Sequence, residues 1–237
     1  MKPLGIMAGS AFFQRRELFG PLEGKMVENE FGQANVFLSD AVVFVPRHGK
    51  DPRHYILPHL INHQANIKAL RDLGVREAVG INSTGSLKIA LKPGTIVVPH
   101  DFIMLSGAPT IFSGESDHIT PTMSEDLRRG LIDTAIDCGF DVLKEGIYWQ
   151  TTGPRLETKA EILMMAQFAD IVGMTMASEA VIAGELDISY ASLCSIDNYG
   201  HGLGEKELTM GEISKHAAGN AEAMIRIIMS YVERRKG

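Results

Sequence analysis

The stretch Ile171–Asn198 constrains the fold most, because it reads as a strand, a helix and a second strand in succession. A short apolar run leads to Thr175 and a helical stretch, and a second apolar run, 188–196, ends on Asp197. In βαβ units, ligands bind beyond the carboxyl ends of the strands. We therefore expect Met174, Thr175 and Asp197 at one edge of a sheet. A thioether, a hydroxyl and a carboxylate together suit a sugar, an anion and a heterocyclic base.

The rest of the chain continues this alternation of strands and helices, with no linker, repeat or low-complexity tract. This pattern predicts an α/β fold, with residues 1–237 forming a single domain whose mixed central sheet is flanked by helices. We expect the segment 82–86 to be a turn and the segment 106–122 to be a long loop. Further strands are expected at 4–7, 36–38, 41–45, 77–81, 95–99, 102–105 and 144–150, and helices at 59–73, 124–138, 158–168 and 210–233.

Composition excludes several classes of function. The formal net charge is −6 and no basic stripe is visible, which argues against binding of nucleic acid or an anionic membrane surface. The apolar patch at the N-terminus is too short for a signal peptide, and no apolar run approaches a membrane span. We therefore expect a cytoplasmic protein in which both cysteines, Cys138 and Cys194, are reduced core residues.

Small polar clusters follow several of the expected strands. Each cluster alone is typical of an ordinary turn or of solvated surface. Together they provide hydroxyls, backbone N–H groups and a guanidinium, which suit a small anion such as inorganic phosphate. No phosphate-binding loop of the nucleoside triphosphate type is present. The clusters are Gly9-Ser10, Arg47-His48, Asn82-Ser83 and Thr175.

Other titratable residues allow both a structural and a functional interpretation. His59 and His63 have helical spacing, but no further ligands accompany them, so a helix face or a subunit contact is favoured over a metal site. Glu157 and Glu179 fit a charge at a helix N-terminus and a buried ion-pair partner, respectively, or a functional role. Asp197 closes an apolar strand, so we expect partial desolvation to raise its pKa.

Five sets of short motifs occur along the chain. They are Pro46-Arg47-His48-Gly49, Asn62-His63-Gln64-Ala65-Asn66-Ile67, Thr84-Gly85-Ser86-Leu87 with Lys92-Pro93-Gly94, Gly153-Pro154-Arg155, and Val172-Gly173-Met174-Thr175 with Glu179-Ala180. The last two sets, in their order and spacing, are the most specific. By these motifs, over most of its length, the chain resembles the purine nucleoside phosphorylases of the trimeric type, nearest to their 5′-methylthioadenosine phosphorylase branch.

The resemblance implies reversible phosphorolysis of an N-glycosidic bond, with inorganic phosphate as co-substrate and without a metal or an organic cofactor. It also implies a homotrimer with a shared active site, in which His118 reaches a neighbouring subunit's sugar pocket. Asp197 would face the purine as the catalytic acid. The other implied roles are phosphate binding by Ser10, Arg47, His48, Ser83 and Thr175, contact with the ribose or its 5′ group by Met174 and Met210, and base binding by Glu157 and Leu156.

The expected base pocket is a hybrid of two branches. The adenine-specific branch has Asp-Tyr-Asp where this chain has Asp197-Asn198-Tyr199, whereas Glu157 is typical of the 6-oxopurine branch. Because a carboxylate accepts from a 6-amino group, we expect cleavage of 5′-methylthioadenosine to adenine and 5-methylthioribose 1-phosphate. The alternatives are a 6-oxopurine nucleoside phosphorylase acting on 5′-methylthioinosine, inosine or guanosine, a hydrolytic nucleosidase that uses Glu179 to activate water, and a non-catalytic nucleoside-binding protein.

Overall fold

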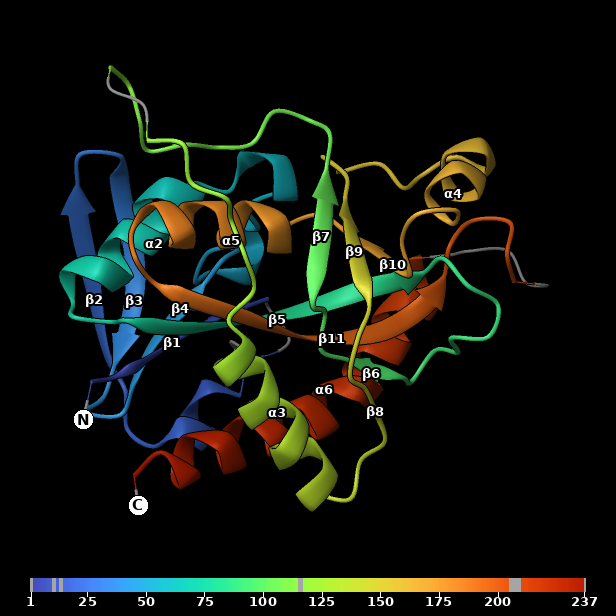
Figure 1. Cartoon of the computed structure of the whole chain (residues 1–237). Coiled ribbons are helices and arrows are strands. Elements are labelled where there is room, and N and C mark those ends of the chain that lie inside the picture. Colours follow the sequence, from blue (N-terminus) through green and yellow to red (C-terminus); the bar gives the residue numbers. More distant parts are fainter. Residues whose placement is uncertain (1, 10–11, 13–14, 115–116, 205–209, 237) are drawn as a thin grey trace.

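One large mixed sheet organises the molecule (Figure 1). The computed structural model describes residues 2–9, 12, 15–114, 117–204 and 210–236. The strands run in the order β2-β3-β4-β1-β5-β10-β9-β7, and β11 pairs with β5 and with β6, which in turn pairs with β8. The strands are β1 (Leu4–Ala8), β2 (Glu23–Asn29), β3 (Gly32–Leu38), β4 (Val42–Pro46), β5 (Glu77–Ser86), β6 (Ile96–Val97), β7 (Asp101–Met104), β8 (Val142–Leu143), β9 (Ile147–Gln150), β10 (Ile171–Gly173) and β11 (Ser189–Tyr199).

Helices cover both faces of this sheet, as Figure 1 shows. They are α2 (His63–Asp72), α3 (Glu125–Asp137), α4 (Lys159–Met165), α5 (Met176–Glu185) and α6 (Met210–Arg234). Along β1, Leu4 and Ile6 pack in the core beneath α3 and α6, whereas Met7 packs in the core beneath α2 and α5. Successive side chains of a strand point to opposite faces, so one short apolar strand supports both layers. The expected α/β fold with a mixed, helix-flanked sheet is confirmed.

Local chemistry explains where the helices begin. Ser124 accepts a hydrogen bond from the backbone N–H of Leu127 and caps α3, as its sequence predicts. Thr158 and Glu161 form a capping box at the start of α4. The expected helix at 59–73 begins only at His63, because residues 58–60 form a separate 3₁₀ turn that starts with a proline. His59 and His63 therefore do not share a helix.

Two expectations about strands are wrong. The segment 82–86, expected to be a turn, continues β5. The strand–helix–strand stretch is also not a parallel βαβ unit, because β10 runs antiparallel to β5 whereas β11 runs parallel to it. The physical reason lies in β1, whose pairing with β5 stops at Ala8 and Ile81. The second half of β5 therefore has a free edge, and β10 pairs there through Ile171 and Val172.

Candidate active site

A cavity of about 400 Å³ lies where the second half of β5 meets the ends of β4, β10 and β11. It brings together eight of the predicted site residues from separate parts of the chain, and α6 adds Ala217, Ala221 and Met224 as an apolar wall. The eight are Arg47, His48, Ser83, Leu156, Glu157, Met174, Thr175 and Asp197.

Three predicted site residues are not among those that line the cavity. His118 is exposed in the long loop and does not contact this cavity within one chain. Ser10 lies outside the described residues, next to Gly9, which does line the cavity. Met210 begins helix α6, but its side chain also lies outside the described part of the chain.

Arg47 leaves β4 and is buried beside the cavity. Its Nε donates to Oε1 of Glu179 at 2.6 Å and its Nη2 donates to Oε2 at 3.0 Å. The backbone carbonyls of Ile81 and Met7 accept from Nη1 and Nη2 at 2.7 and 2.8 Å. Burial opposes the charge, but the carboxylate outweighs it and holds the pKa of Arg47 above its ordinary value. Glu179 is thus the buried ion-pair partner that its position in the sequence suggested, and it is not among the cavity-lining residues.

His48 follows Arg47 and is uncharged at neutral pH. Burial is the main reason that its pKa is lowered to about 4. Its Nδ1 lies 2.8 Å from the carbonyl oxygen of Ile56, and its ring stacks on that of Tyr55 with centroids 4.5 Å apart. A neutral ring that donates from Nδ1 carries a lone pair on Nε2. The ring can therefore accept a hydrogen bond from a ligand but cannot supply positive charge.

Polar side chains of β5, of β11 and of Thr175, the N-cap residue of α5, form a connected hydrogen-bond chain at the cavity wall. Thr175 Oγ1 donates to Asn82 Oδ1 at 2.9 Å, and Asn82 Nδ2 donates to Ser192 Oγ at 2.8 Å. Ser192 donates onward to the carbonyl of Gly80. Because every member has a partner, the chain fixes the orientation of Thr175 at the cavity wall. Asn82 was expected in a turn, but in β5 it supports this wall.

Asp197 and Asn198 both line the cavity because β11 has a bulge there. The pairing of β11 with β5 shifts register between Ile196 and Asn198, so two consecutive side chains reach the same space. Asp197 Oδ1 accepts from Asn220 Nδ2 at 2.7 Å, whereas Oδ2 is buried without a hydrogen-bond partner of normal geometry among the described residues. Burial raises the pKa of Asp197. Sequence reasoning did not assign Asn198 to the site. In a regular strand successive side chains point to opposite faces, so Asn198 would point away from the face that carries Asp197.

Glu157 presents a second carboxylate to the cavity. Its side chain is buried, and its Oε1 accepts from Thr151 Oγ1 at 2.6 Å. Leu156, from the same segment, and Met174, which follows β10, add apolar lining. The cavity therefore combines an apolar surface with two carboxylates and a set of oriented hydrogen-bonding groups, as expected of a small-molecule site.

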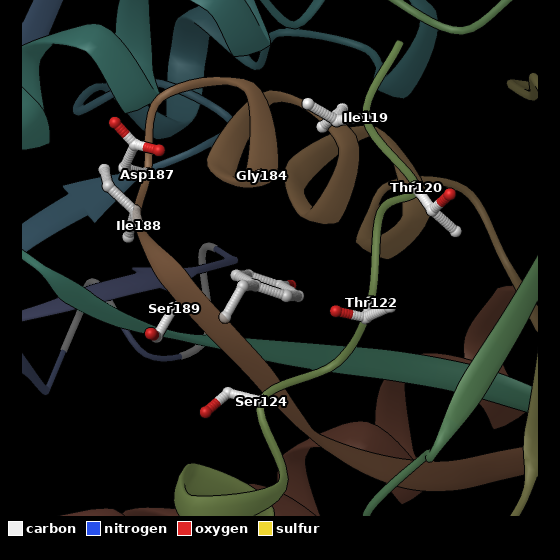
Figure 2. Close-up of a pocket in the computed structure, with 9 residues that line it drawn as sticks. Ile119, Thr120, Thr122, Ser124, Gly184, Asp187, Ile188 and Ser189 are labelled. Atoms are coloured by element: carbon white, nitrogen blue, oxygen red, sulfur yellow. The ribbon is translucent and has the colours of Figure 1, made fainter.

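A second hollow, of about 410 Å³, lies away from these residues (Figure 2). Thr122 and Ser124 lie on the segment that enters α3, and Ile188 and Ser189 lie where the chain enters β11; all four line this hollow. None of the predicted site residues lines this hollow. Within the described residues, no cluster of three or more potential metal ligands occurs, and no helix is both long and apolar enough to cross a membrane.

The fold and the cavity together are those of an α/β enzyme that acts on a small polar substrate. Residues 3–233 match the model of the phosphorylase superfamily, and the chain belongs to this family. It is 39% identical to the probable 6-oxopurine nucleoside phosphorylase of Archaeoglobus fulgidus, over 98% of this chain and 96% of that protein. It is 36% identical to the probable S-methyl-5′-thioinosine phosphorylase of Methanocaldococcus jannaschii, over 97% and 91%.

Among solved structures, the chain is similar to the methylthioadenosine phosphorylase of Schistosoma mansoni in complex with adenine. The TM-score is 0.88 at 26% sequence identity, and the match covers 100% of this chain and 92% of that chain. The family resemblance stated from the motifs is thus confirmed. The names of these relatives differ in the base that they specify.

Proposed function

We propose that the chain is a purine nucleoside phosphorylase that cleaves 5′-methylthioinosine with inorganic phosphate to hypoxanthine and 5-methylthioribose 1-phosphate. The observation that carries this choice is the buried carboxylate of Glu157 on the cavity wall, held by Thr151. An ionised carboxylate only accepts hydrogen bonds. Hypoxanthine has an N1–H to donate, whereas N1 of adenine is itself an acceptor. This reverses the order of preference expected from the sequence, where Asp197 favoured adenine.

In the proposed reaction, the bond between C1′ and N9 breaks and its electron pair stays with the purine. A phosphate oxygen forms the new bond to C1′. Positive charge develops on the sugar and is stabilised by the adjacent anion. Burial raises the pKa of Asp197, which favours the protonated form that can donate a proton to N7 and neutralise the departing base. General acid catalysis of this kind typically contributes about 10²–10⁴-fold.

The anion would lie near Arg47, His48, Ser83 and Thr175, all of which line the cavity. Asn198, which the bulge brings to the same cavity, is a further candidate for contact with the base because its amide can both donate and accept. Holding phosphate and nucleoside in line lowers the entropic part of the barrier. No metal or organic cofactor takes part in this scheme.

One feature of the cavity supports a 5′-methylthio group on the substrate. The wall that α6 contributes is apolar, with Ala217, Ala221 and Met224. A 5′-hydroxyl left unpaired against such a wall would cost about 1–3 kcal/mol.

A homotrimer in which His118 completes a neighbouring subunit's sugar pocket is part of the same proposal. The mass of the protein in solution tests the trimer directly.

The decisive experiment incubates the protein with 5′-methylthioinosine, inosine, 5′-methylthioadenosine and adenosine, each with and without phosphate, and follows base release. We expect release only with phosphate, with the highest kcat/KM for 5′-methylthioinosine. Release without phosphate would instead define a hydrolase. Because Glu179 is committed to Arg47 and Tyr190, no such role is expected for its carboxylate.

A second candidate substrate is 5′-methylthioadenosine. The unpartnered Oδ2 of Asp197 favours it, since this oxygen can accept from a 6-amino group when the carboxyl is ionised. A higher kcat/KM on 5′-methylthioadenosine than on 5′-methylthioinosine would establish this alternative. Calorimetry that detects tight nucleoside binding, in the absence of any turnover, would instead identify a binding protein.

A further inference from the structure

The guanidinium of Arg47 is almost fully used by the protein itself. A guanidinium has five N–H groups. Four of them donate to Glu179 Oε1, Glu179 Oε2, the carbonyl of Met7 and the carbonyl of Ile81. Among the described residues, one N–H on Nη1 has no acceptor and is left for a ligand. The orientation of this single donor depends on the carboxylate that holds the other side of the group.

Glu179 is in turn held by Tyr190, whose hydroxyl donates to Oε2 at 2.7 Å. Glu179 and Tyr190 are both about 1% exposed, so water does not compete for the hydrogen bond between them or for those between Glu179 and Arg47. The packing leaves room for this arrangement only because residue 80 is glycine. A Cβ at Gly80 would lie 2.0 Å from the Tyr190 hydroxyl and 2.8 Å from Glu179 Oε2.

The charges around this end of the cavity cancel. The carboxylate of Glu179 neutralises Arg47 across the 2.6 Å ion pair. Burial lowers the pKa of His48 to about 4 and the pKa of His63, which is also buried, to about 3, so both rings are neutral at pH 7. Arg47 and His48 are the only basic side chains among the described residues that line the cavity.

We propose that Glu179 and Tyr190 are positioning residues, which hold Arg47 so that the site binds its anion by oriented hydrogen bonds and without net positive charge. The inference rests on the proposed function only in taking the anion to be inorganic phosphate. Two properties follow. Phosphate affinity depends weakly on ionic strength, because screening acts on net charge. Hydrogen phosphate binds better than sulfate, because its P–OH can donate to the lone pair of His48, whereas sulfate has no proton to donate at neutral pH.

The variant that tests the positioning role is Tyr190→Phe, which removes one hydroxyl and keeps the ring. We expect the KM for phosphate to rise about three- to tenfold, as the loss of one hydrogen bond predicts, and the KM for the nucleoside to stay within about twofold. Tyr231→Phe is the matched control, since Tyr231 is a buried tyrosine that packs against Gly130 of α3 and does not line the cavity, and both constants should stay unchanged. An unchanged phosphate KM in Tyr190→Phe, or an equal rise in both constants, would refute the positioning role.

Direct calorimetry of phosphate binding to the whole protein, without nucleoside, separates this inference from the proposed function. We expect the dissociation constant of the wild-type protein to change less than about twofold as ionic strength rises tenfold, and sulfate to bind at least about tenfold more weakly. In Glu179→Gln the charge of Arg47 is no longer cancelled, so affinity should fall clearly with salt. A steep salt dependence in the wild-type protein, or sulfate binding as tight as phosphate binding, overturns the inference. Phosphate binding with these properties but without base release would sustain the inference and contradict the proposed function.

Discussion

Replacing Glu157 with glutamine should exchange the preferred base. In the native site Thr151 donates to Oε1. If the glutamine amide keeps its carbonyl oxygen on that hydroxyl, its NH₂ group faces the cavity in place of a carboxylate oxygen. The NH₂ group then opposes N1–H of a 6-oxopurine but matches the acceptor N1 of adenine. The single change converts an acceptor into a donor at nearly constant volume.

The magnitude follows from the kind of hydrogen bond that is lost. A hydrogen bond to a charged group contributes about 1.5–3 kcal/mol, which corresponds to about 10- to 150-fold in kcat/KM for 5′-methylthioinosine. The new neutral hydrogen bond to adenine contributes about 0.5–1.5 kcal/mol, or about 2- to 10-fold in favour of 5′-methylthioadenosine. The ratio of the two kcat/KM values should therefore change by at least about 20-fold.

The assay is phosphorolysis of both nucleosides at saturating phosphate, with base release followed over time. Glu161→Gln is the matched control, because Glu161 lies on the same segment but is paired with Arg155 and does not line the cavity. Adding Thr151→Val to Glu157→Gln should abolish the gain on adenine, since nothing then fixes the amide. An equal loss on both substrates in Glu157→Gln would refute the assignment of Glu157 to the base.

Three further outcomes follow from the buried titratable groups. Asp197→Asn should depress turnover far more than phosphate affinity. Because burial raises the Asp197 pKa, the wild-type protein loses stability as pH rises through that pKa. The melting temperature of the variant should therefore exceed that of the wild type at pH 7, and this difference should vanish in acid. Asn220→Ala removes the donor to Asp197 Oδ1, so the alkaline limb of the kcat/KM profile should move to higher pH, and an unmoved limb would contradict Asp197 as the acid. His63 has a pKa lowered to about 3, so its neutral form contributes stability above pH 6.5 that is lost as pH falls. In His63→Leu the free energy of unfolding should therefore fall less steeply between pH 6.5 and 4, by about 1.4 kcal/mol per pH unit. If the free energies of unfolding of variant and wild type fall in parallel with pH, His63 is not the source of the acid sensitivity.

Much of this architecture was predictable from local patterns. The continuous apolar runs of β1 and β4 indicate strands that are buried on both faces, and Ser124 marks the start of α3. The clusters at Arg47 and Thr175 follow strands as expected, and they do meet in one cavity. These features depend on residues close in sequence, so local physical chemistry is enough to locate them.

The features that escaped prediction depend on partners far along the chain. Asn82 and Thr84 look like a turn because polar residues rarely occupy the middle of a buried strand. In β5 they are satisfied by β11, since Asn82 donates to Ser192 and Thr84 donates to the carbonyl of Ser195. Thr175, between β10 and α5, completes the set by donating to Asn82. The bulge that turns Asn198 toward the cavity likewise appears only when β11 is paired with β5. Neither arrangement has a signature in its own segment.

The cancelled charge of Arg47 has a consequence for the proposed acid. Within the described lining of the cavity, the guanidinium of Arg47 is already paired with Glu179, so an anion bound in the same space adds negative charge beside the Asp197 carboxyl. A nearby like charge disfavours ionisation, so phosphate binding should raise the Asp197 pKa beyond the effect of burial. By linkage, phosphate must then bind more tightly to the protonated enzyme. The co-substrate that attacks the sugar thus also helps to keep the proton that the departing purine requires.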